Sequence, residues 1–328
     1  MLEKAGRRNA FFFRYFLLFA VLIFCTFQFN IDKIYGFSIY PDEFGYWASA
    51  AQMLGYDWSD TAALGYYYSF GYGMILAPIL SIFHDSVTAY RTAVAVNALL
   101  QCGVVWMLWE IYRRLYRIEG LRERKMQAVL AVGTAAFYPP CSFYVQMTMV
   151  ETLLTFLYLF ICYQMVLFIE KKNMRSAVLL ALTLVYLYFV HMRTVGVVIA
   201  AVTVLLLYGW KNACARKSLI VAAVVLTAGM FCGLWIKENV MNTVYAVTDA
   251  EQLAVNDYAG QISNLKSMLT FKGISRLFFS GTGKFYYLVM ASFGLLCPAF
   301  CICLKKTLQV LRRLSSLTED FVDGDGNG

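Results

Sequence analysis

The sequence predicts an all-α membrane protein, a polytopic bundle of about eight transmembrane helices with a large external first loop. Of the 328 residues, 60% are hydrophobic, 17% are aromatic and only 15% are charged, a composition too apolar for a water-soluble domain of this length. Several charge-free apolar runs approach the ~20 residues that cross a bilayer as a helix. The net charge of +8 does not indicate a nucleic-acid partner, because the basic residues fall in a few short segments.

The first apolar run is interpreted as an uncleaved anchor, since no small-x-small cleavage site follows it. The predicted spans are Phe11–Phe29, Thr88–Tyr112, Met126–Val145, Met149–Ile169, Ser176–His191, Thr194–Gly209, Ser218–Ile236 and Phe285–Leu304.

The basic residues orient this map. With a cytoplasmic N-terminus, five segments lie inside: 1–14, 113–125, 170–175, 210–217 and 305–328. They contain twenty of the 28 Lys and Arg residues, as the positive-inside rule requires. We therefore expect both termini in the cytoplasm of a cell bounded by this membrane, residues 1–310 as one transmembrane module and 311–328 as a flexible cytoplasmic tail.

One apolar stretch, Leu64–Phe83, is long enough to be a further span. If it crossed, the basic cluster at 113–125 would lie outside, so we expect residues 30–87 to stay external and to carry two membrane-surface helices. A second external segment, 237–284, is expected to contain an interfacial helix.

Ionisable residues near membrane depth cost free energy, so their presence indicates a function or a structural partner. On this topology they gather on the external face: the first-loop acids Asp42 and Glu43, Glu151 at the start of the fourth span, and the cations Arg91, Arg193 and Lys284. Structural interpretations remain open. Glu151 and Arg193 would then pair and tie two helices together, and Arg91 and Lys284 would anchor helices at the interface.

This set of residues suits group transfer from a phosphate-linked lipid. A carboxylate accepts the proton of an attacking hydroxyl, and cations stabilise the departing phosphate. The aromatic residues Tyr46, Trp47, Tyr72 and Tyr286 are the candidates for contact with a sugar or lipid; an interfacial aromatic belt is the alternative.

Several motifs resemble the GT-C class of membrane glycosyltransferases, in particular the bacterial relatives of protein O-mannosyltransferases and of the lipid A aminoarabinose transferase. The matching motifs are Pro41-Asp42-Glu43-x-x-Tyr46, Gly71-Tyr72-Gly73 with Ala77-Pro78, Tyr90-Arg91, Thr148-Met-Val-Glu151 and Arg193-Thr-Val-Gly196, with a looser match at Lys284-Phe-Tyr-Tyr287.

The resemblance implies roles for these residues. Asp42 would be the catalytic base or a metal contact with Glu43 beside it, Glu151 a second acid, and Arg193 a contact of the donor phosphate. The donor would be a polyprenyl-phosphate sugar, transferred with inversion to a lipid, glycan or protein hydroxyl outside the cytoplasmic membrane. A divalent metal ion at Asp42 and Glu151 is the one cofactor that the resemblance allows.

Two other functions remain open. A lipid-linked saccharide transporter would distribute polar groups through the bilayer, including its midplane. A truncated, inactive relative would keep the fold and lack the activity, since many members of the class are longer.

Overall fold

The computed structural model describes residues 2–29, 31–37, 42–56, 58, 70–116, 122–244 and 270–291. Every regular element in these ranges is a helix. The chain divides into two units, Met1–Asp257 and Tyr258–Gly328. The first unit contains nearly all the described helices.

Among the described residues, five helices are long and apolar enough to cross a membrane, by length and composition: Phe13–Lys33, Ser86–Leu115, Val150–Lys171, Met192–Lys211 and Ala213–Lys237. They correspond to five of the eight predicted spans. Large apolar side chains lie on their outer surfaces, among them Leu18, Leu206, Val224 and Phe231, which are at least half exposed. Such surfaces favour lipid contact over water, which indicates a multi-pass membrane protein.

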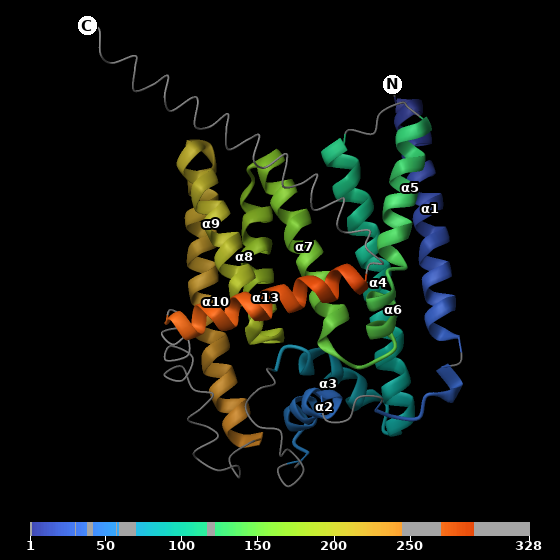
Figure 1. Ribbon diagram of the computed structural model, residues 1–328, viewed down its shortest axis with the longest axis vertical. Helices are drawn as coiled ribbons and strands as arrows, with labels where there is room; N and C mark the ends of the chain where they lie inside the picture. Colours follow the sequence, from blue (N-terminus) through green and yellow to red (C-terminus); the bar gives the residue numbers. More distant parts are fainter. Residues whose placement is uncertain are drawn as a thin grey trace, which may run out of the picture. The chain divides into compact units, whose positions relative to one another are not determined.

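The long helices of the first unit alternate in direction along the chain (Figure 1). They are α1 (Leu2–Gln28), α4 (Ser86–Tyr116), α5 (Arg122–Ala136), α7 (Val150–Lys171), α8 (Met174–Val190), α9 (Val195–Lys211) and α10 (Arg216–Val244). We call the end of this bundle where α4 and α7 begin and α8 ends the site end, and the opposite one the basic end.

The basic end carries most of the cations of the described bundle. They sit in the first half of α1, at the start of α5, at the end of α4 and in the α7–α8 and α9–α10 turns; the last three places contain Arg113, Arg114, Lys171, Lys172, Arg175, Lys211, Arg216 and Lys217. Arg114 also pairs with Glu170 of the neighbouring helix, at 2.6 Å. The charge asymmetry read from the sequence is therefore a property of the folded bundle.

The predicted span Met126–Val145 is not one continuous helix. It is divided into α5 and the short α6 (Pro139–Val145), with Tyr138 extended between them. Proline at the first positions of α6 cannot continue the preceding helix, because it lacks the N–H and clashes with the previous turn. Gln101 of α4 donates a hydrogen bond of 3.0 Å to the carbonyl oxygen of Ala136, which the end of α5 leaves without a helical partner.

The α7–α8 turn is closed by local backbone chemistry. Lys172 ends α7 in the left-handed conformation, with φ 51°. Asn173 then caps α8, because its side chain accepts a hydrogen bond of 3.0 Å from the backbone N–H of Ser176. This tight turn makes α7 and α8 antiparallel neighbours.

Two shorter helices, α2 (Asp42–Met53) and α3 (Gly73–Ile82), lie at the site end (Figure 1). The ten residues of α3 rise only about 15 Å at 1.5 Å each, about half of a bilayer core. Arg91, near the start of α4, donates hydrogen bonds to the carbonyl oxygens of Asp32 and Ile34. The end of α1 and the start of α4 therefore lie at the same end of the bundle. This arrangement agrees with the prediction that Leu64–Phe83 does not cross the membrane.

The sequence predicted a membrane-surface helix in this segment, but the protein encloses α2 on all sides. Every residue from Glu43 to Ala51 is buried. The helix is rich in small residues, so α3 and α10 approach it closely. A Cβ atom on Gly73 would lie 2.9 Å from the Cβ atom of Ser49, for example.

The second unit contributes α13 (Phe271–Ala291) to the described residues. This helix begins fourteen residues before the predicted eighth span, Phe285–Leu304. The rest of that span, residues 245–269 of the segment 237–284 that is expected to contain an interfacial helix, and the tail 311–328 lie outside the described residues.

Candidate functional site

The centre of the site is an ion pair between two helix ends. Glu151 lies in the first turn of α7, and Arg193 lies in the 3-10 turn η3 (Met192–Thr194), between α8 and α9. Nη2 of Arg193 donates to Oε1 of Glu151 at 2.6 Å, and the arginine side chain is 50% exposed. The pairing that the sequence left open is therefore present, and it joins α7 to the α8–α9 turn.

The turn that presents Arg193 is held by its own side chains. Thr194 donates its hydroxyl to the carbonyl oxygens of Leu187 and His191. Nδ1 of His191 accepts a hydrogen bond from the backbone N–H of Arg193, at 3.3 Å. Burial, and then the nearby Arg193 cation, lower the pKa of His191 to about 4. His191 is therefore neutral near pH 7, as an acceptor nitrogen requires.

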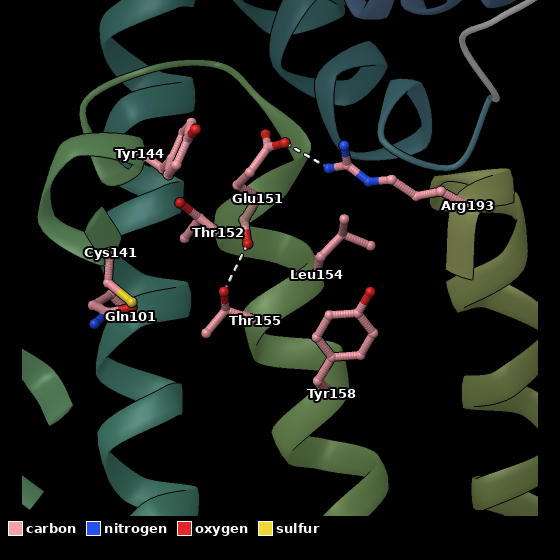
Figure 2. A pocket seen from close by; sticks show the side chains of 9 residues that line it. All are labelled: Gln101, Cys141, Tyr144, Glu151, Thr152, Leu154, Thr155, Tyr158 and Arg193. Carbon is pink, nitrogen blue, oxygen red and sulfur yellow. Dashed lines mark hydrogen bonds and ion pairs between the residues drawn. The ribbon is translucent and has the colours of Figure 1, made fainter. Parts of the chain in front are cut away.

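A cavity of about 260 Å³ opens beside Glu151, lined by residues of α4, α6, α7 and η3 (Figure 2). Two of its polar atoms have no hydrogen-bond partner among the described residues: Oε2 of Glu151 and Oγ1 of Thr152, both buried. By contrast, the neighbouring Thr155 donates its hydroxyl to the main-chain oxygen of Glu151, at 2.8 Å. The cavity is thus an apolar pocket with a few unsatisfied polar groups, the usual form of a ligand site.

Glu43, one of the predicted catalytic acids, is fully buried and anchors three segments. Its Oε2 accepts hydrogen bonds from the hydroxyl of Tyr90 at 2.6 Å, the backbone N–H of Thr148 at 2.8 Å and the hydroxyl of Thr148 at 2.5 Å. The indole N–H of Trp47 also donates to the Thr148 hydroxyl, at 3.0 Å. This network fixes α2 to α4 and to the chain that enters α7.

Asp42 occupies the first turn of α2, next to this anchor, and is only partly buried. Because Glu43 contacts Thr148, only three residues before Glu151, the start of α2 lies close to the start of α7. The two adjacent acids therefore differ in environment, one anchored inside and one nearer the surface.

Arg91 was predicted to contact the donor phosphate, and the structure gives it another role. Its guanidinium group donates to the main-chain oxygens of Ile34 and Asp32 and lies over the Tyr35 ring, 5.3 Å from the ring centre. It thus holds the segment after α1 against α4.

Three of the four aromatic residues predicted to contact a sugar or lipid lie in the protein core. Tyr46, Trp47 and Tyr72 are at most 4% exposed and belong to the core that joins α2, α3, α4, α7 and α8. The hydroxyl of Tyr72 donates to Asn97 at 3.2 Å. These rings fill the space between the short helices and the bundle, so a sugar does not reach them in this structure.

The remaining predicted residues are not tested by the geometry. Lys284 and Tyr286 belong to α13 in the second unit, and their side chains lie outside the described ones. Asp42 and Glu151 were the candidate metal contacts. In the parts of the chain that the structure describes, no three or more His, Cys, Asp or Glu side chains gather into a metal-binding group.

Sequence reasoning missed the residues that line the cavity beside Glu151. Thr155 and Tyr158 follow Glu151 at four and seven residues, which places all three on one face of α7. Polar residues at this spacing on an otherwise apolar helix were the available signal. Tyr144 of α6 had no such signal, because the break at Pro139 decides its position.

The chain matches no protein-family model, no curated protein and no solved structure. Its function must therefore be argued from the residues and geometry described above.

Proposed function

We propose that the protein is a membrane glycosyltransferase of the GT-C type. It moves a sugar from a polyprenyl-phosphate carrier to a hydroxyl group of a lipid, a glycan or a protein. The resemblance of its motifs to that class supports the proposal. The observation that carries it is the Glu151–Arg193 pair beside a cavity, at the end of the bundle opposite the basic residues.

In this proposal, Asp42 is the base. Its carboxylate accepts the proton of the acceptor hydroxyl while that oxygen forms a bond to the anomeric carbon. The bond from the anomeric carbon to the phosphate oxygen breaks on the opposite side, and polyprenyl phosphate leaves with the bonding electrons. The configuration at the anomeric carbon is inverted.

Arg193 stabilises the leaving phosphate. Its side chain is half exposed, so a phosphate can approach the guanidinium group while Nη2 stays with Glu151. A guanidinium group held by a carboxylate is pre-oriented, which favours bidentate phosphate contacts. Glu151 orients this cation, and Glu43 holds the helix that carries Asp42.

We further propose that the chain crosses the cytoplasmic membrane eight times, with its termini inside and the site end outside. The positive-inside rule supports this orientation, since the basic end then faces the cytoplasm. Polyprenyl-phosphate sugars would reach the site from the outer leaflet.

The alternative, a saccharide transporter, finds less support. In the described spans, the charged residues (Asp, Glu, Lys and Arg) sit near the ends, and the middle of each span contains none. The buried Gln101 in the middle of α4 has a structural partner in Ala136. A coupled transporter usually carries its charged groups near the midplane.

The experiment is a transfer assay with the purified protein in lipid nanodiscs and a panel of labelled polyprenyl-phosphate sugars. We expect Asp42→Asn to reduce transfer at least 100-fold, because loss of a general base typically costs about 10²–10⁴-fold. Asp32→Asn is the matched control, an exposed acid of the same loop, and should retain wild-type transfer. Wild-type activity in the Asp42→Asn protein would contradict the assignment of the base.

A further inference from the structure

The cavity beside Glu151 contains two polar atoms that the protein itself does not satisfy. Thr152 is 3% exposed, and its hydroxyl has no partner among the described residues. Oε2 of Glu151 is likewise buried and unpaired, although Oε1 is bonded to Arg193. A buried polar group left without a partner is unfavourable, because it has lost its hydrogen bonds to water. A ligand that bonds to both atoms would replace those bonds.

The charges indicate what kind of ligand fits. The negative charge of Glu151 is already balanced by Arg193, 2.6 Å away. A second cation at Oε2 would leave a net positive charge in an apolar cavity, which is unfavourable. A neutral O–H donor satisfies Oε2 without adding charge, and the Thr152 hydroxyl can donate to or accept from a second hydroxyl. The pattern therefore matches a neutral polyol.

The size and lining of the cavity indicate which neutral polyol fits. The cavity volume of about 260 Å³ is large enough for one sugar ring. Tyr144 and Tyr158 line the same cavity and add aromatic surface with polar tips (Figure 2). Apolar walls with a few hydroxyl and carboxylate groups suit a pyranose.

We infer that this cavity is the subsite for the sugar of the donor, with Glu151 Oε2 and Thr152 Oγ1 as its hydrogen-bonding groups. The inference rests on the proposed function and assigns the sugar a place that the buried rings of Tyr46, Trp47 and Tyr72 cannot provide. In this arrangement Glu151 has two tasks, because one oxygen orients Arg193 toward the phosphate and the other contacts the sugar.

Two threonines of α7 provide a matched test. Thr152→Val removes an unpaired hydroxyl from the cavity, whereas Thr155→Val removes one that is bonded to the backbone of its own helix. Both changes keep the shape of the side chain. The affinities of both variants and the wild type are measured for bare polyprenyl phosphate and for polyprenyl-phosphate mannose, glucose, galactose and arabinose. Thermal unfolding of each variant verifies the fold.

We expect the wild type to bind at least one sugar-bearing carrier more tightly than the bare carrier. Thr152→Val should weaken that binding about 3- to 10-fold, the value of one lost hydrogen bond, and leave the affinity for bare polyprenyl phosphate unchanged. Thr155→Val should have the smaller effect on the sugar-bearing carrier.

The subsite would be overturned if Thr152→Val and Thr155→Val weakened binding of the sugar-bearing carrier equally. It would also be overturned if Thr152→Val weakened binding of the bare carrier as much as binding of the sugar-bearing carrier. A wild type that prefers no sugar-bearing carrier would overturn it as well. If wild-type transfer persists in any of these cases, the proposed function stands without the subsite. Absence of both transfer and carrier binding in the wild type would overturn both.

Discussion

At the scale of single residues, Glu43 shows how one buried carboxylate can be compatible with the fold. Desolvation of a charge is costly unless hydrogen bonds replace the lost water. Three donors meet one oxygen of Glu43, and they come from Tyr90 and Thr148 on two different segments. Charge-assisted hydrogen bonds of this kind are about twice as strong as neutral ones. Glu43 therefore positions its helix, and Asp42 is the acid to which we assign the role of base in the proposed reaction.

His191 makes the stability of the site depend on pH. Burial and Arg193 lower its pKa from 6.5 to about 4, so the unfolded chain binds a proton that the folded chain does not. Its contribution to stability is complete above pH 6.5 and is lost as the pH falls toward 4. Between pH 7 and pH 5 the expected loss is about 2 kcal/mol, at about 1.4 kcal/mol per pKa unit.

The measurement is the unfolding temperature in detergent at pH 7 and pH 5. His191→Asn keeps an acceptor for the Arg193 N–H but does not titrate, so we expect a smaller fall in stability on acidification. His84→Asn alters an exposed histidine and should behave like the wild type. A wild type and a His191→Asn variant with the same pH dependence would disprove this role.

Some residue roles followed from the sequence and others did not. The partnership of Glu151 and Arg193 was foreseen as one of two possibilities, because opposite charges at the same membrane depth attract. The role of Arg91 as an anchor could not be chosen in advance, since its partners are the main-chain oxygens of Asp32 and Ile34. Every residue has such an oxygen, so no residue type in the sequence marks it as a partner.

At the scale of elements, the approach of the chain before α3 to the end of α8 requires a glycine. The N–H of Gly71 donates to the carbonyl oxygen of Phe189 at 2.8 Å, and a Cβ atom at Gly71 would lie 2.5 Å from that oxygen. The hydroxyl of Tyr186 donates to the carbonyl of Gly71, at 2.9 Å. The N–H and the C=O of residue 71 are thus both bonded to groups of α8.

Gly71→Ala should destabilise the folded protein by about 1–3 kcal/mol, because overpacking against backbone atoms cannot be relieved by a side-chain rotation. Gly196→Ala is the control, since a Cβ atom there meets nothing within 4 Å. In the helical context of α9 it should be neutral or stabilise by up to about 1 kcal/mol. Thermal unfolding in detergent measures the stability of both variants. Equal stability of Gly71→Ala and Gly196→Ala would contradict the close approach of residue 71 to Phe189.

Hydropathy predicted the long helices well because a chain in lipid must satisfy its backbone polar groups within each span. It predicted the break between α5 and α6 poorly, although Pro139 and Pro140 were visible in the sequence. Hydropathy also cannot separate rings that face lipid from rings in a protein core, so Tyr46 and Tyr72 were assigned to the surface. Their burial depends on how α2 and α3 pack on the bundle, which a periodic pattern does not encode.

At the scale of the whole molecule, the charge asymmetry between the two ends of the bundle defines a testable orientation. Cys214 is exposed in the α9–α10 turn, at the basic end. Asp32 is exposed at the site end. We expect a membrane-impermeant maleimide to label an Asp32→Cys variant in intact cells. A protein that retains only Cys214 should react only after the membrane is permeabilised.

Each variant in this experiment carries a single cysteine, so the labelled position is unambiguous. Labelling of Cys214 in intact cells together with protection of residue 32 would reverse the orientation. It would also place the proposed sugar transfer in the cytoplasm, where the positive-inside rule does not expect the site end.

The hydrogen bonds from Thr148 and Trp47 also constrain the order of biosynthesis. Thr148 follows Glu43 by 105 residues, so α2 leaves the ribosome long before its anchor exists. Until α7 has been inserted, the only one of the donors to Glu43 described above that is already made is the Tyr90 hydroxyl of α4, and water or lipid headgroups must supply the remaining hydrogen bonds to the Glu43 carboxylate. Docking of α2 is therefore a late event that follows translation of the fourth predicted span.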